Sequence, residues 1–190
     1  MSARRFLIAI ILAFPVFMLT GAGRVTASEA EAWAALRSGA IVLFRHANAP
    51  GTGDPSGFRL ESCSTQRNLG DEGRRQAVRI GERFRSERVR VGAVLSSEWC
   101  RAFETAELAF PGMVQREPAF NSFFDERSEG PAQTARALAV LQGWRGAGTL
   151  VVVTHQVNIT ALSGIAPSEG EGIVLGVTSG AFSVIGRIRP

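Results

Sequence analysis

The chain has 190 residues, of which 45% are hydrophobic and 20% are charged, a composition that suits one globular domain and excludes a largely disordered protein. All 21 residues counted as lysine or arginine are arginines, and tyrosine is absent, which excludes a Schiff-base lysine, a P-loop lysine and a tyrosine nucleophile. His46 and His155 are the only histidines, too few for a three-histidine zinc site.

The first 27 residues have the layout of a secretory signal peptide. Two arginines precede an apolar run over residues 6–19, which is shorter than a membrane span. Val25 and Ala27 satisfy the preference for small residues before a cleavage site. We therefore expect cleavage after Ala27, a secreted or periplasmic mature chain, and no membrane span once the signal is removed. An uncleaved anchor is the alternative.

Export would change how the charge and the cysteines are interpreted. Removing residues 1–27 leaves 18 arginines against 17 acids, a net charge of +1, and no basic run is interleaved with aromatic residues. Nucleic-acid binding is therefore not expected. Cys63 and Cys100 are the only cysteines, and an even count in an oxidising compartment favours a disulfide over two buried thiols, which remain the alternative.

Predicted helices and strands alternate along residues 28–190. A capping box at Ser28 starts a short helix that Gly39 ends, and the apolar run 40–44 is typical of a buried strand. Residues 47–70, rich in Gly, Pro, Ser, Thr and Asp, predict one long surface loop. The remaining elements are helices over 71–86, 99–110 and 131–141, strands over 89–95 and 150–154, a short helix, and strands near 172–177 and 181–188. This alternation predicts a single layered α/β domain.

Three of these strands end in residues that carry chemistry. The first runs into Arg45 and His46, the second is followed by Arg101 after one helical turn, and the third runs into His155. Ligands of open α/β sheets bind beyond the carboxyl ends of the strands. Two histidines and two arginines gathered there predict an oxyanion site, and phosphate is the expected ligand because guanidinium groups match phosphate oxygens. The alternatives are structural histidines and a solvated arginine, since Arg101 lies opposite the apolar stripe of its predicted helix.

Four ordered motifs carry a family resemblance. They are Phe44-Arg45-His46-Ala47, Asn68-Leu69-Gly70-Asp71-Glu72-Gly73, Ser96-Ser97-Glu98-Trp99-Cys100-Arg101-Ala102 with Glu104-Thr105-Ala106, and Val153-Thr154-His155. Together they resemble the histidine phosphatase superfamily. The resemblance implies a phosphoglycerate-mutase-like fold, a three-layer α/β/α sandwich around a mostly parallel central sheet. It also implies that His46 is transiently phosphorylated and that Arg45, Arg101 and His155 surround the phosphate, with no cofactor.

Physical chemistry supports these roles. Phosphoryl transfer needs an in-line nucleophile and neutralisation of charge on the equatorial oxygens, which two arginines and a second imidazole supply without a metal. Neighbouring arginines favour a neutral His46, the form that can attack phosphorus. His155 is expected to stabilise the phosphate as a cation or as a hydrogen-bond donor.

The sequence departs from the family pattern at two places. Ala47 stands where a glycine usually follows the Arg-His pair, and Ser122 stands near the position of the usual glutamate proton donor. A leaving alkoxide needs a proton, so an acid is expected nearby. Asp125 is the first candidate and Glu126 the second, and both could instead be ordinary solvated acids of a loop.

Further pocket candidates lie in the loops. Asn48 and Asn158 are expected to bind the phosphate or the substrate, and Arg59 and Arg67 are further candidates in the long loop. A Cys63–Cys100 disulfide would hold that loop as a lid beside Arg101.

The function predicted from the sequence is an exported phosphomonoesterase acting on a small phosphate ester or an envelope component. A non-catalytic binding protein that uses the same pocket for an anionic ligand is the alternative. A metallohydrolase is a weak third, because no clear carboxylate cluster accompanies the histidines. Neither the substrate nor the oligomeric state follows from the sequence.

Overall fold

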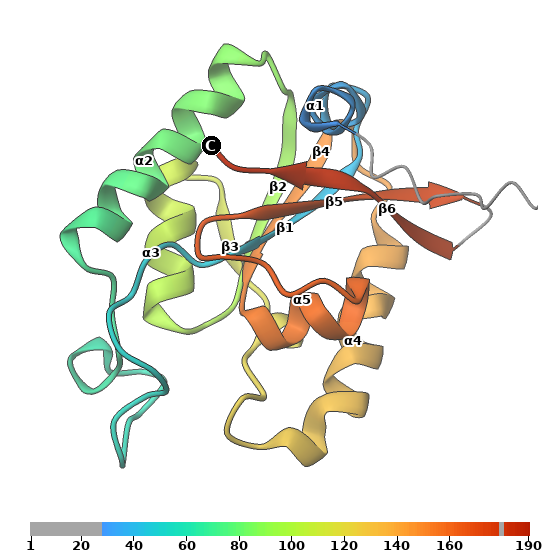
Figure 1. Ribbon diagram of the computed structural model, residues 1–190. Helices are drawn as coiled ribbons and strands as arrows, with labels where there is room; N and C mark the ends of the chain where they lie inside the picture. The colour runs from blue at the N-terminus through green and yellow to red at the C-terminus, as the bar shows by residue number, and fades with distance from the viewer. Residues whose placement is uncertain (1–27, 179–180) are drawn as a thin grey trace, which may run out of the picture.

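The protein folds around one six-stranded sheet with helices on both faces (Figure 1). The computed structural model describes residues 28–178 and 181–190; the predicted signal peptide lies outside this range. The helices are α1 (Glu29–Arg37), α2 (Asp71–Ser86), α3 (Cys100–Ala109), α4 (Gly130–Gly143) and α5 (Gln156–Ser163). The strands are β1 (Ile41–Arg45), β2 (Val91–Ser96), β3 (Val114–Arg116), β4 (Thr149–Thr154), β5 (Gly172–Thr178) and β6 (Ala181–Ile188). Short 3-10 turns are η1 (Cys63–Thr65), η2 (Pro118–Phe120) and η3 (Arg127–Glu129).

The sheet is mostly parallel, as predicted. Its strand order is β3-β2-β4-β1-β5-β6, and the β3-β2, β2-β4 and β4-β1 pairs are all parallel. Strand β5 is antiparallel to both of its neighbours. Strand β3 was missed from the sequence, because three residues at a sheet edge leave too short a pattern to detect. The parallel strands β1, β2 and β4 bring their carboxyl ends to the same edge.

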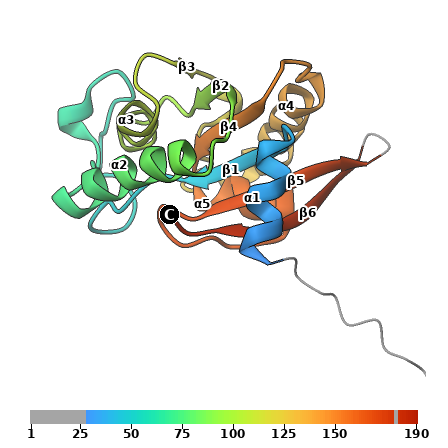
Figure 2. The ribbon, with the colours of Figure 1, turned by 90° about the horizontal axis from the view of Figure 1, so that it is seen from above.

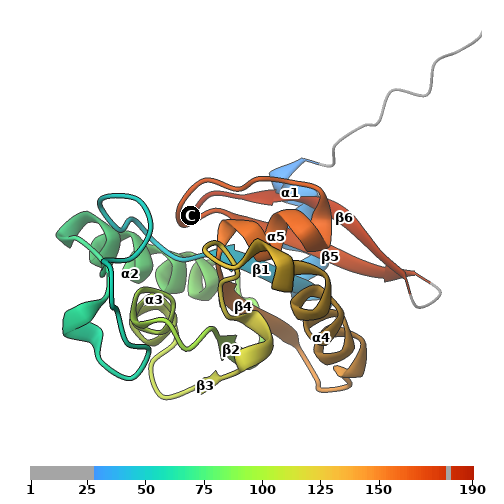
Figure 3. The same ribbon diagram turned by 90° about the horizontal axis from the view of Figure 1, so that it is seen from below.

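Side chains of the central strands alternate between two cores. On β1, Val42 and Phe44 pack on the face covered by α1, α2 and α3, whereas Ile41 and Leu43 pack on the face covered by α4 and α5. Views from above and from below show these two helical layers on opposite sides of the sheet (Figures 2 and 3). The three-layer α/β/α architecture is therefore confirmed.

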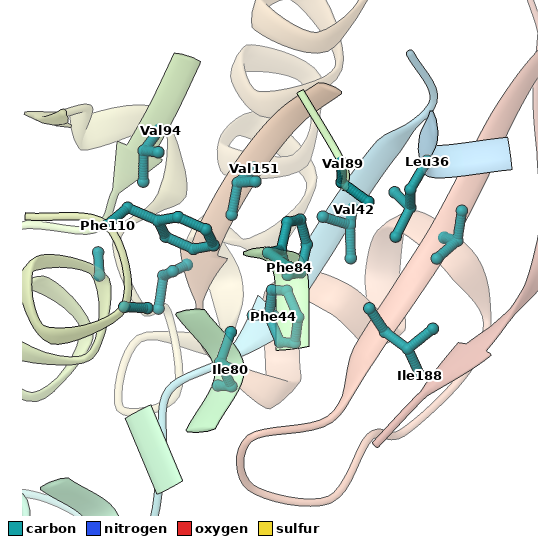
Figure 4. Packing of buried hydrophobic residues seen from close by; sticks show 14 of the residues in the cluster. Leu36, Val42, Phe44, Ile80, Phe84, Val89, Val94, Phe110, Val151 and Ile188 are labelled. Atoms are coloured by element: carbon teal, nitrogen blue, oxygen red, sulfur yellow. The ribbon is translucent and has the colours of Figure 1, made fainter. Parts of the chain in front are cut away.

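The first core is centred on the aromatic ring of Phe84 (Figure 4). The Phe84 ring centroid lies 5.3 Å from that of Trp33, 5.9 Å from that of Phe44 and 5.1 Å from that of Phe110. These contacts join α1, α2, β1 and the end of α3. Gly81 lets α2 approach the Ala109 carbonyl of α3 so closely that a Cβ would collide with it.

The capping box predicted at Ser28 is present at the start of α1. The Ser28 hydroxyl accepts a bond from the Glu31 N–H, and the Glu31 carboxylate accepts one from the Ser28 N–H, which completes the predicted capping box of α1. Gly39, with φ of +92°, turns the chain from α1 into β1. No helix among residues 28–178 and 181–190 is long and apolar enough to cross a membrane.

Candidate active site

The two histidines lie side by side beyond the carboxyl ends of β1 and β4. Arg45 pairs with Thr154 in the parallel register, and the His46 N–H donates to the Thr154 carbonyl at 2.9 Å. The strands thereby carry His46 and His155 to adjacent positions, and the centroids of the two imidazole rings are 5.5 Å apart. Both side chains are buried. Their proximity is a direct consequence of the sheet topology.

A cavity of about 120 Å³ opens beside these rings. The predicted residues that line it are Arg45, His46, Arg101, His155 and Asp125, and the lining also includes residues 51–54, Arg67, Ser122, Phe124, Gln156 and Val157. The structure thus brings five predicted site residues and Arg67 to one pocket. Three of these residues are arginines, so the pocket suits an anion.

His46 has the protonation pattern of a nucleophile. Its Nδ1 lies 2.8 Å from the Ala47 carbonyl oxygen, which can only accept a hydrogen bond. Nδ1 therefore carries the proton, and Nε2 keeps its lone pair. Burial, followed by the charge of Arg101, lowers the pKa of His46 well below its usual 6.5. The imidazole is neutral near neutral pH, as a phosphoryl acceptor requires.

The His155 ring forms a hydrogen bond with Ser97. Its Nε2 lies 2.8 Å from Ser97 Oγ, and the Trp99 N–H donates to the same oxygen at 3.2 Å. Burial, then Arg101 and His46, lower the pKa of His155 well below 6.5. Of the two expected roles, the structure favours the neutral hydrogen-bond donor over the cation. The Ser97 hydroxyl also lies 3.3 Å from Asn121 Oδ1, to which it can donate its one proton; when it donates to His155 Nε2 instead, the imidazole proton resides on Nδ1.

Arg45 and Arg101 are each fixed by protein acceptors through their terminal nitrogens. Arg45 donates from Nη1 to the Pro167 carbonyl at 3.2 Å and from Nη2 to Glu169 at 3.4 Å. Arg101 donates from Nη1 to both oxygens of Asp54, at 2.8 and 3.0 Å. The Nε atoms of both arginines are buried, and no residue of the described chain accepts a bond from either.

Arg101 is buried rather than solvated. Its side chain is 4% exposed, although its position opposite the apolar stripe of α3 favoured a surface location. The loop over residues 47–70 covers that side of α3 and supplies Asp54, which the helical pattern of α3 alone does not reveal. Burial lowers the pKa of Arg101, and the hydrogen bond and charge of Asp54 oppose that effect.

Several other candidates lie outside the pocket lining. The Asn48 amide donates to Glu169 at 2.8 Å, and the Asn158 amide donates to the Asn121 carbonyl at 2.9 Å. Arg59 pairs with Glu61 on the exposed part of the long loop. Glu126 does not line the pocket, whereas Asp125 does, on the segment after η2. The geometry therefore favours Asp125 over Glu126. It turns the amide nitrogens of both asparagines to protein partners, while Asn158 Oδ1 is buried without a partner among the described residues.

Two carboxylates beside the pocket were missed from the sequence. Asp54 lines the pocket against Arg101, and Glu169 contacts Arg45, Arg67 and Asn48. Asp54 lies in the sequence Gly53-Asp54-Pro55, which is equally typical of an exposed turn. Its partner is 47 residues away, so no local pattern could reveal the pair.

The long loop is fastened to the amino end of α3. A disulfide joins Cys63 to Cys100, with the Cα atoms 5.6 Å apart, and the Gln66 side chain accepts a bond from the Cys100 N–H at 3.0 Å. Both attachments lie next to Arg101 in the sequence. The loop, which also contains η1 and supplies residues 51–54 and Arg67 to the pocket lining, is thus tethered beside the pocket.

Removing this disulfide is expected to destabilise the fold. Cys63 and Cys100 are 37 residues apart in sequence. For a loop of that length, loss of the cross-link lowers the free energy of unfolding by about 4 kcal/mol in the chain-entropy account. Denaturant unfolding of a Cys63→Ser/Cys100→Ser double variant measures this, with reductant added to both proteins as the control. Equal stability of oxidised wild type and the double variant would contradict a structural role.

The two buried histidines predict a loss of stability in acid. Their folded pKa values lie below 6.5, so below that pH the unfolded chain binds more protons than the native one. Their contribution is complete above pH 6.5 and is lost as the pH falls, at up to about 1.4 kcal/mol per pH unit for each histidine. Denaturant unfolding between pH 7.5 and 5.0 measures the slope. His155→Gln should make it shallower, and an unchanged slope would show that His155 does not titrate this way.

Comparison with known proteins assigns part of the chain to a family. Residues 41–134 match the histidine phosphatase superfamily (branch 1). No curated protein matches the sequence. Among residues 28–178 and 181–190, no three His, Cys, Asp or Glu side chains are grouped so that they could hold a metal ion.

Several solved structures share the fold. The protein histidine phosphatase SixA complexed with tungstate has a TM-score of 0.57 at 16% identity, covering 80% of this chain and 97% of that one. YhfR of Bacillus stearothermophilus has 0.57 at 18%, covering 76% and 94%. A phosphoserine phosphatase mutant from Entamoeba histolytica, in complex with phosphoserine, has 0.55 at 15%, covering 78% and 95%. Residues 41–134, which contain Arg45, His46 and Arg101, belong to the histidine phosphatase superfamily (branch 1).

Proposed function

We propose that this protein hydrolyses phosphoric monoesters through a phosphohistidine formed on His46. The observation that carries the proposal is the pair of buried Nε–H donors of Arg45 and Arg101, in residues that line one pocket with two neutral histidines. Guanidinium N–H groups bind phosphate oxygens strongly. A phosphoryl group between the two arginines would satisfy both donors while it meets the free Nε2 of His46.

The proposed reaction proceeds in two displacements. His46 Nε2 forms a bond to phosphorus as the bond to the ester oxygen breaks, and the leaving oxygen takes a proton. Water then attacks the phosphohistidine, gives up a proton and releases orthophosphate, which restores neutral His46. Arg45, Arg101 and the N–H of His155 stabilise the charge on the equatorial oxygens in both steps.

Asp125 is proposed as the acid that supplies the first proton and accepts the second. Within the described lining, the only other carboxyl is Asp54. Burial acts to raise the pKa of Asp54, but hydrogen bonds from Arg101, Arg67 and Trp99 outweigh it and keep that pKa below its usual value. Asp54 therefore stays ionised, whereas Asp125 lies on an exposed loop where it can exchange protons with water.

Hydrolysis of a panel of phosphorylated compounds tests this function. The panel includes sugar phosphates, nucleotides, phosphoserine and a phosphohistidine peptide, because the related structures include a protein histidine phosphatase and a phosphoserine complex. Release of orthophosphate that survives a chelator and is lost in His46→Ala supports the proposal. Tight orthophosphate binding with no hydrolysis of any compound would favour the non-catalytic binding protein.

We also propose that the chain is exported after cleavage behind Ala27. The Cys63–Cys100 disulfide supports this, because such bonds persist in oxidising compartments. Amino-terminal sequencing of the protein from its native cells tests it. A mature chain that begins at Ser28 is expected, and an intact amino terminus in a reducing compartment would contradict it.

A further inference from the structure

The carboxylate of Asp54 is built into the wall of an anion-binding pocket. Its side chain is 3% exposed, and it lines the pocket together with Arg101. A buried negative charge at this place has two physical interpretations. It either holds Arg101 in a productive orientation or competes with the phosphate for Arg101. The hydrogen bonds of the two side chains distinguish these possibilities.

Both carboxylate oxygens of Asp54 accept hydrogen bonds from protein donors. Oδ1 accepts from Arg101 Nη1 at 2.8 Å and from the Arg67 N–H at 3.0 Å. Oδ2 accepts from Arg101 Nη1 at 3.0 Å and from Trp99 Nε1 at 3.0 Å. The carboxylate is thus fixed from three directions, and it engages a single nitrogen of the guanidinium.

The remaining edge of Arg101 is left for a ligand. Its Nε is buried and has no acceptor within residues 28–178 and 181–190. Arg45 also has a buried Nε without an acceptor among the described residues, but both of its terminal nitrogens donate to protein, Nη1 to the Pro167 carbonyl and Nη2 to Glu169, whereas the described acceptors of Arg101 bond only its Nη1. In both arginines a carboxylate binds a terminal nitrogen and no described residue accepts from Nε, so each carboxylate supports its guanidinium group without using that donor.

The loop that carries Asp54 is also attached to α3 at Cys63 and Gln66. The disulfide between Cys63 and Cys100 and the bond from the Cys100 N–H to Gln66 join the loop to the first turn of α3, the turn that carries Arg101. Asp54 and Arg101 are therefore held in one unit.

We propose that Asp54 is a positioning residue, which clamps Arg101 through Nη1 so that its Nε edge faces the phosphoryl group. This inference rests on the proposed function for the identity of the ligand. It predicts that Asp54 promotes phosphate binding despite its negative charge, because a guanidinium free to rotate loses the directed, charge-assisted bond.

A double-mutant cycle on orthophosphate affinity tests the clamp. The proteins are wild type, Asp54→Asn, Arg101→Lys and the double variant. The control is Asp71→Asn, which removes the charge of an exposed carboxylate that pairs with Arg74. Calorimetry with orthophosphate should show binding weakened about tenfold to a hundredfold in Asp54→Asn, and unchanged in Asp71→Asn. In the Arg101→Lys background, Asp54→Asn should weaken binding no further, because Asp54 acts through the guanidinium.

Three outcomes would overturn the clamp. They are unchanged or tighter binding in Asp54→Asn, losses that multiply in the double variant, and no orthophosphate binding by the wild type. If Asp54→Asn does not fold, Asp54→Glu replaces it in the cycle, because glutamate keeps the negative charge but displaces the carboxylate. Weaker orthophosphate binding by Asp54→Glu supports the clamp, and unchanged binding overturns it. Hydrolysis is scored separately, so a wild type that binds orthophosphate without turnover rejects the proposed function while the cycle still decides the clamp.

Discussion

His46→Ala is expected to abolish turnover while leaving the phosphate pocket in place. The variant removes the Nε2 lone pair that attacks phosphorus in the proposed mechanism, whereas His155 is expected to bind the phosphate and its Nε2 is held by a hydrogen bond with Ser97. Loss of a catalytic nucleophile lowers kcat by at least about 10⁴-fold. Steady-state release of orthophosphate from the best substrate of the panel measures the effect.

Binding of orthophosphate provides the control for this variant. Arg45 and Arg101 keep their protein partners at Glu169 and Asp54, so the anion should still bind to His46→Ala. His155→Ala should have a smaller effect on kcat than His46→Ala. It removes one hydrogen-bond donor to the phosphate and not the nucleophile, which lowers kcat by about 10²–10³-fold. Turnover by His46→Ala within tenfold of wild type would contradict the nucleophilic role.

Arg101→Lys is expected to lower kcat/KM by about 10²–10³-fold although it keeps the positive charge. A lysine ammonium is a point charge that cannot present one edge to Asp54 and another to the phosphate, as the planar guanidinium can. Orthophosphate affinity should fall as well, because the buried Nε donor is lost. Steady-state kinetics and calorimetry measure the two effects.

The matched control is Arg75→Lys on the exposed face of α2. Arg75 forms an ion pair with Glu72 at the surface and lies outside the pocket lining. Surface pairs of this kind contribute little, so activity and stability should change little. An equal loss of activity in both variants would show a general effect of the substitution, and full activity in Arg101→Lys would contradict the role of the guanidinium.

The position of the two histidines could be predicted because it follows from buried strands. The apolar runs before Arg45 and His155 identify β1 and β4, and parallel pairing of these neighbours fixes the two histidines at one edge. Arg101 was placed at the pocket by its distance from the end of β2. Its burial was not predictable, because the covering loop is positioned by contacts far apart in sequence, above all the pair with Asp54.

Asn48 and Asn158 are predicted pocket residues that the structure places outside the pocket lining. Asn48 and Asn158 were expected in the pocket because they follow the histidines closely in sequence. In the structure the Asn48 amide meets Glu169, and the Asn158 amide meets the Asn121 carbonyl. Side-chain direction in a loop or in the first turn of a helix depends on partners from other segments. Glu169 itself carries no local pattern that marks it as a partner of Arg45.

Trapping the phosphorylated enzyme tests the central claim most directly. Wild type and His46→Ala are mixed with substrate, quenched within milliseconds in base, where phosphohistidine survives, and digested for mass spectrometry. The account predicts an acid-labile phosphoryl group on the peptide that contains His46 in the wild type, and none in the variant. Substrate turnover by the wild type without phosphorylation of His46, or with the phosphoryl group on His155, would contradict it.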